Sequence, residues 1–166
     1  MKNTLGLAVV ALVAAVSSVI CARLQIPVWS MFIGWIAFVA GGMSSKTAPP
    51  TFVCAILGVL LGFLGAFIIG NATSALGGDL ALLLGVFVIV FAALLAQGMP
   101  FANLVICYFI GMTTFFASNL APQMSTLLVL GSGLLAGVVS GLVAVTISGR
   151  ITRASAPARD VAASRG

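Results

Sequence analysis

The chain has 166 residues, of which 62% are hydrophobic and 5% are charged, and its formal net charge is +5. A soluble domain carries about 25% charged residues, so this composition leaves too little polar surface for a water-soluble globule, and it is too apolar for a disordered chain. Together with a mean hydropathy of +1.32, it indicates an integral membrane protein.

Six apolar runs follow one another along the chain. They cover residues 4–21, 28–42, 50–70, 80–96, 101–117 and 124–148. A helix needs about 20 residues to cross a hydrocarbon core of roughly 30 Å. The runs are apolar on all sides, whereas the strands of a membrane β-barrel alternate apolar and polar positions. The sequence therefore predicts an all-α membrane protein whose six transmembrane helices form one domain, residues 1–148.

The first two runs differ from an ordinary span. The first run follows Lys2, as a signal peptide would, but it is long for a signal peptide and no A-x-A site follows it, so we interpret it as a retained span. The second run is short because Pro27 and the pair Gly41-Gly42 bound it. As a helix, residues 28–40 would be about 20 Å long, which does not cross a bilayer alone.

Two polar segments interrupt or follow the apolar runs. Residues 71–79 separate the third run from the fourth, and we expect a loop there. Residues 149–166 are rich in Ala, Ser and Arg, and we expect a disordered basic tail that is a solvated flank of the last span. Contact of its arginines with anionic lipid headgroups is an alternative. A pI of 9.9 also suggests nucleic acid, but scattered arginines without aromatic neighbours are a poor footprint for it, so we expect no nucleic-acid partner.

The basic residues gather on one side of a six-span layout. Arg23 and Asp79 lie on the opposite side. The basic residues that share a side with both termini are Lys2, Lys46, Arg150, Arg153, Arg159 and Arg165. Since cytoplasmic loops of membrane proteins carry the excess of Lys and Arg, we expect both termini in the cytoplasm.

Residue types that carry catalysis are nearly missing. The chain has no His, and Asp79 and Asp160 are its only acids. A catalytic triad or a His and carboxylate metal site cannot be assembled from these residues. Cys21, Cys54 and Cys107 lie in apolar runs without C-x-x-C spacing and are expected to be buried thiols. We therefore expect no enzyme, no cofactor, no metal and no proton relay through intramembrane acids.

A short repeat divides the chain into two halves. The tripeptide Phe-Ile-Gly at 32–34 recurs at 109–111, an offset of 77 residues, and this offset also places Phe38 on Phe115. The same offset carries the first run onto the fourth and the third onto the sixth.

We therefore expect two three-span repeats, about 4–70 and 80–148. Because three is an odd number, the halves would enter the membrane from opposite sides, as inverted repeats do in many transporters and pores.

The second and fifth runs each place small or weakly polar residues and one Phe within a sector of about 100° on one helix face. The first stripe consists of Ser30, Gly34, Ala37, Phe38 and Gly41, and the second of Cys107, Gly111, Thr114, Phe115 and Ser118, with Asn103 one turn earlier. Two interpretations stay open. The stripes mediate close helix packing, or they face each other across a pseudo-two-fold axis and line a narrow path that binds solute.

The third and sixth runs carry glycines four residues apart. They are Gly58 and Gly62 in the third run, and Gly133, Gly137 and Gly141 in the sixth. At an offset of 75 residues, Gly58 falls on Gly133 and Gly62 falls on Gly137. Such series commonly mediate tight helix contact, within a chain or between copies of it, so we assign these glycines to packing.

The segment Trp-Ser-Met-Phe-Ile-Gly-Trp-Ile-Ala-Phe-Val-Ala-Gly-Gly at 29–42 and the segment Tyr-Phe-Ile-Gly-Met-Thr-Thr-Phe-Phe-Ala at 108–117 resemble the YcdZ-like bacterial inner-membrane proteins. That family is a domain of unknown function. The resemblance extends to the length, the order of the spans and the basic tail. It implies a multi-pass protein of the bacterial cytoplasmic (inner) membrane, and it brings no catalytic or binding residues.

The leading hypothesis is a small channel or facilitator for a neutral or weakly polar solute of the urea, amide or ammonia class. It rests on the lack of ionised side chains in the apolar runs, because a charged permeant would find no counter-charge there. The alternatives are a secondary transporter of a small anion or organic solute and a non-transporting membrane assembly subunit. The expected partners are the lipid bilayer, the solute and further copies of the chain in a homo-oligomer.

Overall fold

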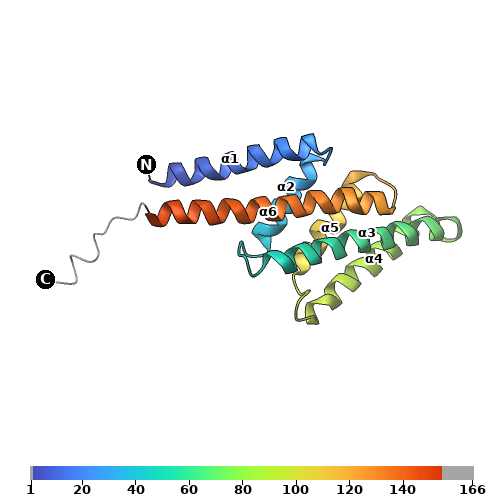
Figure 1. The fold of residues 1–166 in the computed structure, drawn as a ribbon. Helices are drawn as coiled ribbons and strands as arrows, with labels where there is room; N and C mark the ends of the chain where they lie inside the picture. The colour runs from blue at the N-terminus through green and yellow to red at the C-terminus, as the bar shows by residue number, and fades with distance from the viewer. Residues whose placement is uncertain (1, 155–166) are drawn as a thin grey trace.

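The computed structural model describes residues 2–154, and apart from turns and linkers this part of the chain is helical. Its elements are α1 (Lys2–Arg23), α2 (Val28–Ala40), α3 (Ala48–Leu76), α4 (Gly78–Leu95), the short 3-10 helix η1 (Ala96–Gly98), α5 (Val105–Ser118) and α6 (Met124–Ala154) (Figure 1). The six α-helices follow the six apolar runs in order. The prediction of an all-α chain is therefore confirmed for the described residues.

Four of these helices are long and apolar enough to cross a membrane. They are α1, α3, α4 and α6, with mean hydropathies between 2.2 and 2.8 over their most apolar windows. In contrast, α2 has 13 residues and α5 has 14. At 1.5 Å per residue each short helix is about 20 Å long, less than a hydrocarbon core of roughly 30 Å. The described chain thus has the length and composition of a membrane protein with four long helices and two short ones.

The long helices lie side by side in the order α1, α6, α3, α4, and the short helices cross them (Figure 1). The most extensive contacts in the chain are those of α2 with α6 and of α5 with α3. Figure 1 also shows that α3 and α6 run in opposite directions. The short helix of each half of the sequence therefore packs mainly on the last helix of the other half.

The polar segment 71–79, expected as a loop, is mostly helical. Only Gly77 separates α3 from α4. The side chains of Asn71 and Thr73 donate hydrogen bonds of 2.8 and 2.6 Å to carbonyl oxygens four residues earlier in α3. Because these polar groups are satisfied within the helix, α3 continues through them and stops at the glycine.

The end of α6 also differs from the expectation. We expected the tail to begin at Gly149, but α6 extends to Ala154. No proline lies between the start of α6 and Pro157, so the helix is free to continue past the apolar run. The remainder of the expected tail, residues 155–166, lies outside the described residues.

The fifth helix begins four residues later than its apolar run. The linker before it is held to α5 by Tyr108, whose hydroxyl donates a hydrogen bond of 3.0 Å to the carbonyl oxygen of Ala102. Both residues are buried. This contact anchors the chain where it turns from α4 into the crossing helix.

The core lies where the short helices cross the long ones. Among the largest fully buried side chains are Met31 and Phe38 on α2, Leu130 and Leu134 on α6, and Val59 on α3. In the described part of the chain every buried polar side chain carries a hydroxyl and none carries a charge; these side chains are Ser30, Thr51, Thr114, Thr126 and Ser140.

Candidate functional site

The first stripe lies buried against α6. A Cβ atom on Gly34 would lie 2.7 Å from the Cα atom of Leu134 and closer still to its carbonyl oxygen. A Cβ atom on Gly141 would lie 2.7 Å from a ring carbon of Phe38. Gly133 and Gly137, also on α6, approach Ser30 and Met31 in the same way. Small residues on both helices therefore permit contact at backbone distance.

The second stripe lies against α3 in the same manner. A Cβ atom on Gly111 would fall on the carbonyl oxygen of Ala55 and 2.9 Å from the Cα atom of Gly58. A Cβ atom on Gly62 would lie 2.6 Å from a ring carbon of Phe115. The glycines assigned to packing from the sequence thus face the stripes within one chain.

The two stripes meet at the centre of the molecule, where α2, α3, α5 and α6 form what we call the four-helix junction. There the thiol of Cys107 points to the carbonyl oxygen of Ala37, with 3.9 Å between the two atoms. The hydroxyls of Ser30 and Thr114 donate hydrogen bonds of 2.7 Å to backbone carbonyls three and four residues earlier in the chain, respectively. Backbone atoms occupy the space beside Gly34 and Gly111, so the junction is closed in this structure.

Two of the expected site residues lie apart from the junction. Ser118 is half-buried at the end of α5, where its hydroxyl donates a hydrogen bond of 2.6 Å to the carbonyl oxygen of Phe115. Asn103 is exposed and precedes α5, so it does not extend the second stripe by a helical turn. The other nine stripe residues are all buried.

One hydroxyl in the junction forms no hydrogen bond of ordinary geometry with any described residue, and only the thiol of Cys107, a weak hydrogen-bonding group, lies beside it. It is Oγ1 of Thr51, on α3, whose side chain is fully buried. A Cβ atom on Gly41 would lie 3.1 Å from the Cβ atom of Thr51 and nearer still to this oxygen, so the hydroxyl faces the carboxyl end of α2. An unpaired buried hydroxyl costs about 1–3 kcal/mol and needs an explanation.

Sequence reasoning missed Thr51, because one threonine in an apolar run is typical of ordinary packing. The surroundings of its hydroxyl are set by α2, because the hydroxyl faces the carboxyl end of that helix. The proximity of Gly41 in the linker after α2 could not be derived from spacing along α3.

The contacts of the two stripes correspond pair by pair. Residues of α2 match residues of α5 at an offset of 77, and residues of α3 match residues of α6 at an offset of 79. The matching pairs are Gly34–Leu134 with Gly111–Ala55, Met31–Gly137 with Tyr108–Gly58, and Phe38–Gly141 with Phe115–Gly62. Every contact that α2 makes in this set therefore has a counterpart made by α5.

This correspondence changes the register expected for the glycines. At the expected offset of 75, Gly58 falls on Gly133, whereas the contacts match Gly58 with Gly137 and Gly62 with Gly141. The difference is four residues, about one helical turn. Because glycines recur every four residues in α6, the sequence matches itself almost equally well one turn away.

The sequence pattern of one known family matches most of the chain. The family is described as a protein of unknown function (DUF1097), and the match covers residues 6–149. No curated protein and no solved structure matches the chain. The expected YcdZ-like assignment is therefore supported at the level of an unknown-function family, without a named relative.

Proposed function

We propose that the chain, which belongs to this family of unknown function (DUF1097), is a membrane facilitator or channel for a small neutral or weakly polar solute. The urea, amide and ammonia class is the proposed substrate. The four-helix junction is its proposed constriction, which must widen for a solute to pass.

The charge distribution supports a neutral substrate. Among the described residues, the buried polar side chains are hydroxyls, and Arg23, Lys46 and Asp79 lie at helix ends or in linkers. An ion in a hydrocarbon core needs a counter-charge or a ring of carbonyl groups. Hydroxyls can instead replace the hydrogen bonds that water gives to a neutral polar molecule.

The observation that carries the proposal is the unpaired hydroxyl of Thr51. It is fully buried at the junction, and a hydroxyl that gains no hydrogen bond is less favourable there than an apolar group of the same shape. A solute that passes would supply the missing partner. The apolar rings of Phe38 and Phe115, which pack against a glycine of α6 and a glycine of α3 respectively, would exclude hydrated ions.

The proposed architecture is a pair of inverted three-helix repeats. The paired contacts of the stripes and the opposite directions of α3 and α6 support it. In such an arrangement the pseudo-two-fold axis lies in the membrane plane and passes through the junction, where solute sites of repeat proteins commonly lie. With its basic residues on one side, the protein would lie in the bacterial cytoplasmic membrane with both termini in the cytoplasm.

The test replaces the Thr51 hydroxyl without changing the shape of the side chain. We expect Thr51→Val to fold at least as well as the parent and to lower the flux of urea and acetamide into liposomes severalfold. Thr51→Ser, which keeps the hydroxyl, should keep most of the flux. Stopped-flow light scattering measures the flux, and thermal unfolding measures the fold.

Thr146→Val is the matched control, because the hydroxyl of Thr146 already donates a hydrogen bond of 2.7 Å to the carbonyl oxygen of Leu142. It should leave the flux unchanged. If Thr51→Val leaves the flux unchanged as well, Thr51 has no part in transport. Uptake that needs an ion gradient would favour a secondary transporter, and a parent protein without any flux would favour an assembly subunit.

A further inference from the structure

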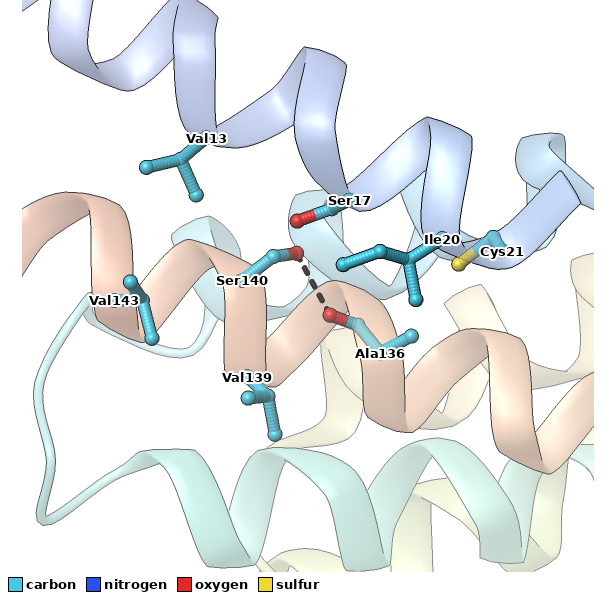
Figure 2. Close-up of a pocket in the computed structure, with 8 residues that line it drawn as sticks. All are labelled: Val13, Ser17, Ile20, Cys21, Ala136, Val139, Ser140 and Val143. Carbon is cyan, nitrogen blue, oxygen red and sulfur yellow. Dashed lines mark hydrogen bonds between the residues drawn. The ribbon is translucent and has the colours of Figure 1, made fainter. Parts of the chain in front are cut away.

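A pocket of about 220 Å³ lies between α1 and α6, lined by residues outside both stripes (Figure 2). Its walls include Val13 and Ile20 from α1 and Val139 and Val143 from α6. Two hydroxyls also line it, those of Ser17 and Ser140, and Figure 2 shows the Ser17 hydroxyl pointing across the pocket toward Ser140. The pocket is thus an apolar cleft that contains two serine hydroxyls.

The two hydroxyls offer different hydrogen-bonding groups. The Ser140 hydroxyl donates to the carbonyl oxygen of Ala136, 2.7 Å away, so its proton is used and its lone pairs remain (Figure 2). The Ser17 hydroxyl has no hydrogen bond to any described residue. The adjacent Ser18, in contrast, donates to the carbonyl oxygen of Ala14. The pocket therefore presents one free donor and one free acceptor.

The other half of the chain contains the equivalent pocket, between α3 and α4. Seven of its eight lining residues lie at an offset of 79 from residues of the first pocket, with Leu61 in place of Ser140 and Ala96 in place of Ser17. The eighth, Tyr108, has no counterpart, and its hydroxyl already donates to the carbonyl oxygen of Ala102. Leucine side chains line its α3 wall, from Leu57 to Leu64. The pair of serine hydroxyls is thus absent from this second pocket, although its position in the fold is the same.

Hydrocarbon tails cannot satisfy a hydroxyl, so a lipid chain explains the second pocket but not the first. A molecule with both a carbonyl oxygen and an N–H group matches the first pocket. The Ser17 hydroxyl would donate to the carbonyl oxygen, and the N–H group would donate to the Ser140 oxygen. A small amide has both groups, and its alkyl part fits the valine and isoleucine walls.

We infer that the α1–α6 pocket is a binding site for a small neutral primary amide, held by Ser17 and Ser140. The pocket is large enough, since a cavity of about 150 Å³ holds benzene. The inference takes its solute class from the proposed function, but the site lies outside the junction and binding does not require transport. The amide site would thus lie to the side of the junction, between α1 and α6, and the equivalent pocket between α3 and α4 would not share it.

The experiment labels the full-length protein in lipid vesicles with a butyramide derivative that carries a diazirine, and maps the labelled peptides by mass spectrometry. We expect labels on the α1 segment near Val13 and Ile20 and on the α6 segment near Val139, and excess butyramide should remove them. A hydrogen bond changes affinity roughly two- to tenfold. Ser17→Ala and Ser140→Ala should therefore each raise the butyramide concentration that removes half of the labelling by that factor.

Ser132→Ala is the matched control, since Ser132 lies on α6 outside this pocket and donates to the carbonyl oxygen of Val129. It should leave the competition unchanged. Labelling that butyramide does not compete would show that the pocket is not a specific amide site and holds a lipid chain or another apolar molecule. Competition that survives the loss of both hydroxyls would show that the serines do not hold the amide, and either result would overturn the inference. Competed labelling together with an unchanged flux in Thr51→Val would retain this site and remove Thr51 from the proposed route through the junction.

Discussion

Gly111 is required by the space around it rather than by its backbone conformation. It lies in the middle of α5, where a Cβ atom would fall on the carbonyl oxygen of Ala55 and close to the Cα atom of Gly58. Both neighbours are backbone atoms of α3, which cannot rotate away as a flexible side chain can. Any larger residue must therefore separate the two helices.

We predict that Gly111→Leu destabilises the protein by more than the 1–3 kcal/mol that overpacking typically costs, because backbone has to move. The measurement is the fraction of protein that stays monodisperse in size-exclusion chromatography after heating. Gly70→Leu is the control, since no atom lies within 4 Å of a Cβ atom at Gly70, and it should behave as the parent does. A folded Gly111→Leu protein with reduced flux would instead favour a path along the second stripe.

Residue types and their spacing predicted most of the buried stripe residues but not the polar groups that carry the proposals. Small residues at helical spacing identify a contact face, because this spacing alone places them together. Ser17 and Ser140 lie on the first and last helices, and their sequence separation gives no sign of a shared pocket. Thr51 lacks a partner only in the folded chain.

At the scale of helices, the apolar runs predicted the number and order of the helices. The residues at which the helices begin and end depend instead on local hydrogen bonds and on glycine conformation. The hairpin between α3 and α4 is the clearest case. The polar residues before it form hydrogen bonds within α3, so polarity alone did not end the helix. Gly77 ends it, with φ of 79° and ψ of 163°, a conformation that other residues rarely adopt.

We predict that Gly77→Ala lowers the free energy of unfolding by about 1–3 kcal/mol, the usual cost of such a backbone conformation in a non-glycine residue. Apart from its neighbours in the chain, no described residue has an atom within 4 Å of a Cβ atom at Gly77, so the cost is conformational and not steric. Gly78→Ala is the matched control, because Gly78 is helical and also open. Thermal unfolding of the three proteins should place Gly78→Ala at or above the parent, and equal losses in both variants would contradict the explanation.

At the scale of the molecule, the sequence repeat predicts two halves, but it gives no sign that the short helix of each half packs on the last helix of the other. Each short helix packs on the last helix of the other half. The offset changes from 77 for α2 and α5 to 79 for α3 and α6, so two additional residues lie between the matched contacts of the second half. Matching by sequence could not detect this change, because the glycines of α6 repeat every turn.

The direction of the chain across the membrane is the last property that a direct measurement can test. Figure 1 places the N-terminus, the α2–α3 linker and the end of α6 toward one end of the long helices, and the α3–α4 turn toward the other. The linker contains Lys46, whereas the turn is next to Asp79. Since positive loops stay in the cytoplasm, the turn should face the outside.

We predict that Ala75→Cys reacts with a membrane-impermeant maleimide added to intact cells, and that Ser45→Cys reacts only after permeabilisation. Both positions are exposed, and the three native cysteines are buried, so the introduced thiols should give nearly all of the signal. Unmodified parent protein measures the remaining background. The reverse pattern would overturn the orientation, and labelling of both positions from outside would mean that the chain inserts in both directions. Reaction of Ala75→Cys alone would place the α3–α4 turn and the basic linker on opposite sides, as a single crossing of α3 requires.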